Sequence, residues 1–148
     1  MEIEKRFMEE ALSLAREAAA EGEVPVGAVV VRGGEVISRA YNRAEKSGDP
    51  AMHAEFIALK EASEALNTRD LSSCVLYVTM EPCPMCAGAC LLYRIGAVAF
   101  GAYDARAGAF GSVVDIGNGA FGRTIPVIGG IMRDECAAEL TDFFKDKR

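Results

Sequence analysis

Residues 75–93 read VLYVTMEPCPMCAGACLLY, a stretch in which a strand, a turn and a helix follow one another. The apolar run Val75–Thr79 predicts a buried strand, and residues 84–93 predict a helix. Cys83 directly precedes the predicted helix and Cys86 lies three residues later, so both sulfur atoms belong to the first helical turn. Free backbone N–H groups and the helix dipole at that end favour thiolates, which bind metals well. The stretch therefore predicts a metal site where a strand meets a helix.

Apolar patterns on both sides of this unit predict further elements. Additional helices are expected at residues 3–21, 52–66 and 134–144, and additional strands at residues 24–31, 36–41, 98–100 and 125–128. This order predicts an α/β fold: a three-layer α-β-α sandwich with a mixed central sheet, formed by residues 1–148 as a single domain. Residues 101–123 are rich in glycine and alanine, and we expect them to form an irregular loop that faces substrate.

The single histidine of the chain, His53, adds a third ligand to the two thiols. One neutral imidazole and two thiolates cancel the charge of Zn²⁺ and leave its fourth position open for water. Glu55 follows His53 by two residues, and such residues face nearly opposite ways on a continuous helix. They converge only if the site lies beyond a helix end. We therefore predict that two helix N-termini meet around one zinc ion per chain, with Glu55 as general acid and base rather than as a fourth ligand.

Two other interpretations of the cysteine pair remain open. It could be a redox pair, although such a pair does not need the His-x-Glu triplet. It could also belong to a closed structural zinc site with Cys90 as the fourth ligand. Cys90 shares an apolar helical stripe with Ala89 and Leu92, which favours packing in the core. The isolated Cys74 and Cys136 are likewise expected to be small buried residues.

The composition bounds the location and the partners of the chain. The N-terminal residues are too charged for a signal peptide, and no stretch approaches the roughly 20 apolar residues of a membrane span. We therefore expect a cytoplasmic protein that does not enter a membrane. The formal net charge of −6 counts against a large polyanionic partner, but residues 94–133 carry a small basic excess. The acidic charge weakens the hypothesis of a nucleic-acid substrate but does not exclude it.

The cysteine and histidine motifs resemble those of a known family. His53-Ala54-Glu55 together with Pro82-Cys83-x-x-Cys86 matches the signature of the zinc-dependent cytidine-deaminase superfamily. The flanking sequence is similar to that of the bacterial tRNA-specific adenosine deaminases, in the segments Gly22–Ala28, Asn42, Asp49-Pro50, Tyr77–Thr79, Glu81–Ala89, Arg94-Ile95, Phe100–Ala102, Asp104, Gly108, Gly111-Ser112 and Phe143-Phe144. The likeness covers nearly the whole chain.

This resemblance implies a cytidine-deaminase-like fold and the hydrolytic deamination of the wobble adenosine in a tRNA anticodon stem-loop to inosine. It implies that His53, Cys83 and Cys86 bind zinc and that Glu55 carries protons between water, the base and the departing ammonia. The substrate contacts implied by the resemblance are Asn42, Val26, Ala54, Pro82 and Asp104. It also implies a homodimer in which loop residues of one chain complete the active site of the other.

The chain departs from the family at two places that bear on the substrate. Family members usually carry an Asn-His pair before the last strand, where this chain has Gly122-Arg123, and many extend the last helix with more basic residues. Together with the acidic charge, these departures keep open a deaminase of free nucleobases or nucleosides, such as guanine, cytosine or adenosine. A catalytically silent, zinc-stabilised interaction module is a further alternative. Glu55 argues against it, because a structural metal needs no proton shuttle.

Overall fold

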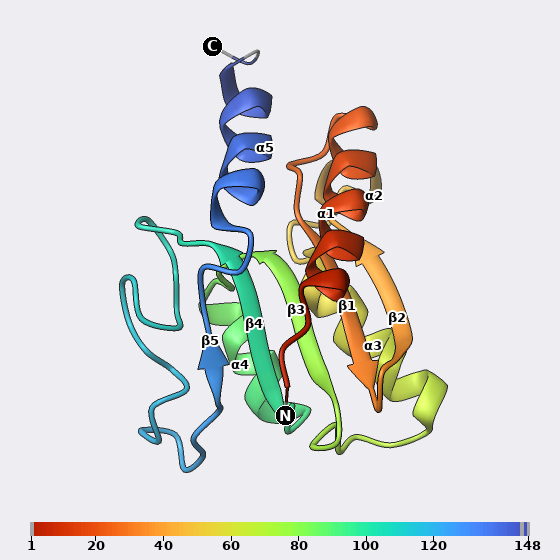
Figure 1. The fold of residues 1–148 in the computed structure, drawn as a ribbon, viewed down its shortest axis with the longest axis vertical. Helices are drawn as coiled ribbons and strands as arrows, with labels where there is room; N and C mark the ends of the chain where they lie inside the picture. Colours follow the sequence, from red (N-terminus) through yellow and green to blue (C-terminus); the bar gives the residue numbers. More distant parts are fainter. Residues whose placement is uncertain (1, 146, 148) are drawn as a thin grey trace.

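A five-stranded mixed sheet forms the centre of the molecule in a computed structural model, which describes residues 2–145 and residue 147 (Figure 1). The strand order is β2-β1-β3-β4-β5. The strands are β1 (Gly27–Arg32), β2 (Glu35–Tyr41), β3 (Val75–Met80), β4 (Ala97–Ala102) and β5 (Val127–Ile128). β1 pairs antiparallel with β2 and β3, whereas β3, β4 and β5 run parallel.

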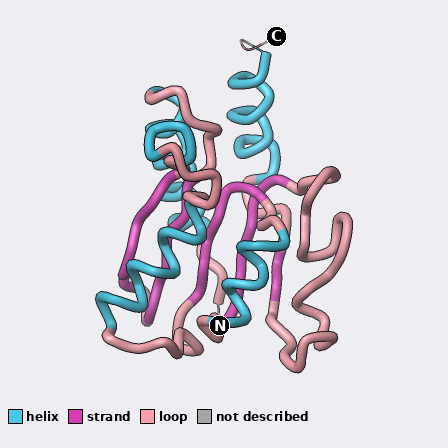
Figure 2. Tube along the Cα trace, turned by 180° about the vertical axis from the view of Figure 1, so that it is seen from behind, coloured by secondary structure: helices cyan, strands magenta, loops and turns pink. Residues whose placement is uncertain are grey.

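Helices cover both faces of this sheet. α1 (Lys5–Ala20) and α5 (Arg133–Lys145) lie on the face toward the viewer in Figure 1. α3 (Ala54–Leu66) and α4 (Pro84–Leu92) cover the opposite face, which Figure 2 shows from behind. α1 lies so close to β1 that a Cβ on Gly27 would overlap the backbone of Ala11. The predicted three-layer α-β-α sandwich with a mixed sheet is confirmed.

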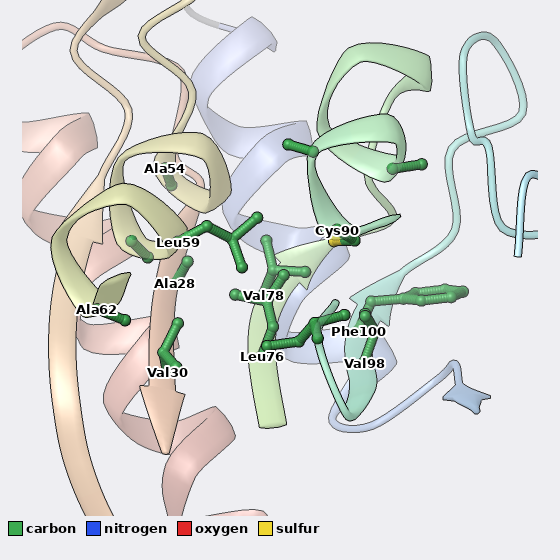
Figure 3. Close-up of a cluster of buried hydrophobic side chains, with 14 of the residues drawn as sticks. Ala28, Val30, Ala54, Leu59, Ala62, Leu76, Val78, Cys90, Val98 and Phe100 are labelled. Atoms are coloured by element: carbon green, nitrogen blue, oxygen red, sulfur yellow. The ribbon is translucent and has the colours of Figure 1, made fainter. Parts of the chain in front are cut away.

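The strands bury alternate residues in two separate cores, as the two-residue period of a strand requires. Ala28 and Val30 of β1 and their counterparts in β3 and β4 meet the helices α3 and α4 (Figure 3). Val29 and Val31 point to the other face and meet α1 and α5. Cys74 and Cys90 are fully buried in the first core and Cys136 is buried in the second, as predicted.

The structure adds one helix to those predicted and shortens two of the predicted strands. A short helix, α2 (Ala44–Ser47), was not predicted. The first strand begins at Gly27 instead of Val24, because the N–H of Val26 donates to the carbonyl of Val24 in a tight turn. The last strand comprises only Val127 and Ile128, because the N–H of Ile125 donates to Gly117 rather than to β4.

The segment between β4 and β5 forms long loops along one flank of the sheet (Figure 2). It contains no helix or strand among its residues, as predicted, and two isolated bridges join Phe110 to Asp115 and Asn118 to Thr124. Additional backbone hydrogen bonds, such as that from Ile116 to Ala109, fold the segment on itself. It is irregular in shape but internally bonded.

Across the part of the chain that the structure describes, none of the helices has the length and apolar character needed to traverse a bilayer.

Candidate active site

Two helix N-termini carry the histidine and the thiols. His53 is the N-cap of α3 and Cys83 is the N-cap of α4, and both have extended backbone conformations. Pro84 occupies the start of α4, where its missing N–H costs no hydrogen bond. Cys86 lies in the first turn of the same helix. The predicted meeting of two helix ends is confirmed by the proximity of these three side chains.

The three side chains have the spacing of a tetrahedral zinc site. The Nδ1 atom of His53 lies 3.6 Å from the sulfur of Cys83 and 3.5 Å from that of Cys86, and all three donor atoms lie within 4.8 Å of one another. Ideal tetrahedral coordination with ordinary Zn–S and Zn–N bond lengths separates a sulfur from a nitrogen by about 3.6 Å. Cys90 does not belong to this group of donor atoms. The donors present therefore fit a zinc ion held by three protein ligands.

The electrostatics of the two thiols also suit a cation. A hydrogen bond from Cys86 lowers the pKa of Cys83 to about 4, and the adjacent His53 contributes in the same direction. The same sulfur–sulfur hydrogen bond, together with burial, raises the pKa of Cys86. The two sulfur atoms therefore share one proton unless a cation stabilises both as thiolates. A divalent metal removes that competition and is neutralised by the pair.

Glu55 lies in the first turn of α3, two residues after His53, and is only 4% exposed. Burial raises the pKa of its carboxyl to about 7, against the opposing effects of backbone hydrogen bonding and His53. Because His53 is an extended N-cap rather than a helical residue, the two side chains face the same cavity despite their spacing. A carboxyl with a pKa near neutrality can both accept and return a proton.

A cavity of about 160 Å³ opens above these groups. It is smaller than the roughly 300–1,000 Å³ of pockets that enclose a drug-sized ligand, so it suits a single planar base better than a whole nucleotide. Its lining comprises Val24, Val26, Asn42, His53, Ala54, Glu55, Met80, Glu81, Cys83 and Asp104. Of the substrate contacts expected from the family, only Pro82 does not line the cavity. It is buried, and its carbonyl accepts a hydrogen bond from the N–H of Ala109.

Asn42 and Asp104 reach the cavity from the ends of two strands that are not neighbours in the sheet. Asn42 follows β2, is buried, and accepts a hydrogen bond from the N–H of Ala44 through its side-chain oxygen at 3.4 Å. Asp104 follows β4, and one carboxylate oxygen accepts from the N–H groups of Arg106 and Ala107 at 2.9 and 3.2 Å. Both side chains are therefore fixed by local turns beside the cavity.

Glu81 and Met80 line the cavity although the sequence pattern gave no role to either. Glu81 is 2% exposed, and its carboxylate accepts hydrogen bonds from Asp104, Phe110 and Ser112. Burial alone would raise the pKa of Glu81, but these hydrogen bonds outweigh it and hold the pKa below its usual value. The one available signal was an acidic residue at the end of a buried strand, directly before Pro82.

Arg123 marks the place where the chain departs from the family. Its side chain lies near the end of α4 that is opposite to the thiols. Its guanidinium donates to the carbonyl of Ile95 at 3.3 Å, just beyond the C-terminal end of α4. Cys83 and Cys86 lie at the N-terminal end of that helix. Arg123 therefore ties the loop to the turn between α4 and β4 and does not line the cavity.

Comparison with known proteins agrees with this geometry. A family model described as the cytidine and deoxycytidylate deaminase zinc-binding region matches residues 1–102. A tRNA-specific adenosine deaminase of Bacillus subtilis is 41% identical over 149 residues, which cover 100% of this chain and 92% of that protein. A solved structure from a study of A-to-I editing by tRNA:A34 deaminases superposes with a TM-score of 0.89 at 40% identity, covering 93% of this chain and 100% of that chain.

A more distant structural relative is a guanine deaminase from Nitrosomonas europaea, with a TM-score of 0.84 at 27% identity. The match covers 97% of this chain and 85% of that chain. The relatives therefore act on different nucleobases with one fold. This chain belongs to the zinc-dependent cytidine and deoxycytidylate deaminase family, among the tRNA-specific adenosine deaminases.

Proposed function

We propose that this protein deaminates adenosine to inosine at the wobble position of tRNA. The observation that carries the proposal is the placement of a buried carboxyl, Glu55, beside a three-ligand zinc cluster at the base of a cavity sized for one base. The near full-length similarity to tRNA-specific adenosine deaminases supports adenosine in tRNA as the substrate.

In this proposal His53, Cys83 and Cys86 hold one zinc ion per chain. When bound, the ion would act as a Lewis acid that lowers the pKa of the attacking water molecule. Glu55 accepts a proton from the attacking water and gives it to N1 of the purine as the water oxygen bonds to C6. It then accepts the proton of the new hydroxyl group and gives it to the amino group, and the C6–N bond breaks to release ammonia. The buried position of Glu55 excludes bulk water from these transfers.

The cavity lining provides for recognition of the base. Asn42 offers a buried amide that can hydrogen-bond to the nucleoside, and Asp104 offers a carboxylate in the same cavity. Val26 and Ala54 provide apolar contact and, at Ala54, a backbone group in the first turn of α3. Pro82 contributes indirectly, because its carbonyl accepts a hydrogen bond from the N–H of Ala109. Residues 1–148 act in this proposal as one deaminase domain in the cytoplasm.

Inosine formation on an anticodon stem-loop with a wobble adenosine tests this proposal. We expect conversion of the stem-loop, with no comparable turnover of free adenosine, cytidine or guanine under the same conditions. Guanine is the sharpest competitor, because a guanine deaminase shares the fold. Turnover of a free base without conversion of the stem-loop would contradict the assignment of tRNA and favour a free-base deaminase.

We also propose that the protein is a homodimer that forms through the outer face of α4. Leu92 is 82% exposed, Phe121 is 69% exposed and Met85 is 39% exposed. They line an apolar hollow of about 580 Å³ together with Phe56, Pro84, Gly88, Ala89, Leu91 and Ile116. Apolar patches of this kind on a small protein mark interaction sites. Because Pro84 and Met85 adjoin Cys83, a second copy seated here would lie beside the active site.

A charge placed on this face is expected to separate the dimer. Leu92→Glu buries a carboxylate in the apolar interface and should shift the protein from dimer to monomer in sedimentation or light-scattering measurements. Phe144→Glu is the matched control, because Phe144 is an exposed aromatic residue on α5, away from α4. A wild-type protein that is monomeric at micromolar concentration would contradict the proposed dimer.

A further inference from the structure

Glu81 is a buried carboxylate at the point where β3 gives way to the zinc-binding turn. β3 ends at Met80, and the first thiol is Cys83. The backbone N–H of Glu81 donates to the carbonyl of Ala102, at the end of β4, at 2.8 Å. Its main chain is therefore fixed to the sheet, and its side chain is free to serve a different segment.

The carboxylate binds one loop at several points. Oε1 accepts from the N–H of Asp104 at 3.0 Å and from the hydroxyl of Ser112. Oε2 accepts from the N–H groups of Phe110 and Ser112, each at 3.1 Å. These partners follow Glu81 by 23 to 31 residues. Among the residues that the structure describes, the carboxylate has no salt-bridge partner. Backbone and hydroxyl donors alone satisfy its charge.

The loop approaches the carboxylate without spare space. A Cβ on Gly108 would overlap the carboxyl group of Glu81 and the carbonyl of Asp104. The N–H of Ala109 also donates to the carbonyl of Pro82 at 2.9 Å. Residues 104–112 are thereby held against the two residues that precede the thiol Cys83, and Asp104 forms part of the cavity wall.

We propose that Glu81 is a positioning residue that fixes the 104–112 loop as the substrate-binding wall of the active site. It acts through Asp104 and its neighbours and takes no part in proton transfer. This inference rests on the proposed deaminase function, because it concerns the same cavity. Glu81 thereby supports substrate binding indirectly, and the chemical step is left to the zinc site and Glu55.

The isosteric change Glu81→Gln tests this role, because a glutamine cannot replace the carboxylate in either orientation. An NH₂ group at the Oε2 position faces two backbone N–H donors. At the Oε1 position it faces the N–H of Asp104. At least one buried N–H therefore loses its acceptor, which corresponds to a factor of roughly 5–150 in an equilibrium constant.

Hydrogen–deuterium exchange of the purified zinc-loaded protein gives a readout that does not depend on substrate. We expect amides in residues 104–112 to exchange about 10-fold faster or more in Glu81→Gln, while zinc content and the exchange of α3 stay unchanged. Glu23→Gln is the matched control. Glu23 is an equally buried carboxylate that accepts from the N–H groups of Glu45 and Lys46, so its effect should fall on α2. Unchanged exchange of residues 104–112 in Glu81→Gln would overturn the inference.

The second experiment measures the steady-state kinetics of the variant on the substrate that the wild type converts. For Glu81→Gln we expect KM to rise about 10-fold with kcat changed much less, because the wall is loosened and the zinc site is not. A fall in kcat at constant KM would overturn the positioning role. A wild type that converts no anticodon stem-loop would instead count against the proposed function, and the exchange arm would still decide the role of Glu81.

Gly108→Ala is a second variant that tests the same contact, in case Glu81→Gln does not fold. This change leaves Glu81 chemically intact but forces the loop away from it, because the new methyl group has no room. It should increase exchange in the same residues 104–112 and raise KM in the same direction. Exchange that increases elsewhere in Gly108→Ala, with residues 104–112 still protected, would contradict the close fit on which the inference depends.

Discussion

Replacing Glu55 with glutamine is expected to abolish deamination while the fold and the zinc content remain. Glu55 is 4% exposed, and burial raises the pKa of its carboxyl to about 7. Glutamine keeps the shape of the side chain but can neither accept the proton of water nor return it to the leaving amine. A positioned acid or base contributes about 10²–10⁴-fold to rate. Because the proposal uses Glu55 in both directions, we expect a loss at the upper end of that range.

The measurement is kcat for inosine formation, made beside zinc content and the unfolding midpoint. Glu61→Gln provides the control, since Glu61 is an exposed residue of the same helix and lines no part of the cavity. It should keep wild-type activity. A Glu55→Gln variant that retains more than about a tenth of wild-type kcat would remove the proton-shuttle role, since general acid–base catalysis supplies at least about 10². Loss of zinc in the same variant would instead assign Glu55 to metal binding.

The three zinc ligands could be predicted from sequence, because the residues that position them lie close to them in the chain. Cys83 and Cys86 belong to one helical turn, and Pro84 marks where that helix begins. His53 and Glu55 could share a site only beyond a helix end, which placed His53 at the N-cap of α3. The remaining uncertainty was whether the two helix ends meet. The structure shows that they do, because α3 and α4 pack on the same face of one sheet.

The parts that sequence did not predict depend on contacts between residues distant in the chain. α2 is only four residues long, and its first N–H groups are satisfied by Glu23, more than 20 residues earlier. Helices this short are not stable by local propensity alone. Residues 104–112 likewise donate hydrogen bonds to Glu81, which no local sequence pattern marks as an acceptor for that loop. In both cases, the sequence patterns did not predict that a buried carboxylate accepts hydrogen bonds from backbone N–H groups of a distant segment.

Replacing Cys83 with alanine is expected to remove the zinc ion and, with it, all measurable deamination. The sulfur of Cys83 lies 3.6 Å from Nδ1 of His53, so it supplies one of three donors in the cluster. Two remaining donors cannot form the closed side of a tetrahedral site, and the thiol that has the lower pKa is the one removed. Zinc content should fall from about one ion per chain to near zero. The unfolding midpoint should also fall, because the metal binds only the folded chain.

Two other cysteines make this experiment specific. Cys136→Ala removes a buried thiol from the opposite face of the sheet, and it should keep the zinc ion even if it lowers stability. Cys90→Ala separates an open site from a closed one, because Cys90 lies on α4 but outside the group of donor atoms. We expect Cys90→Ala to retain about one zinc ion per chain. Loss of zinc in that variant would indicate a closed structural site with four protein ligands, and such a site has no position at which water could be activated.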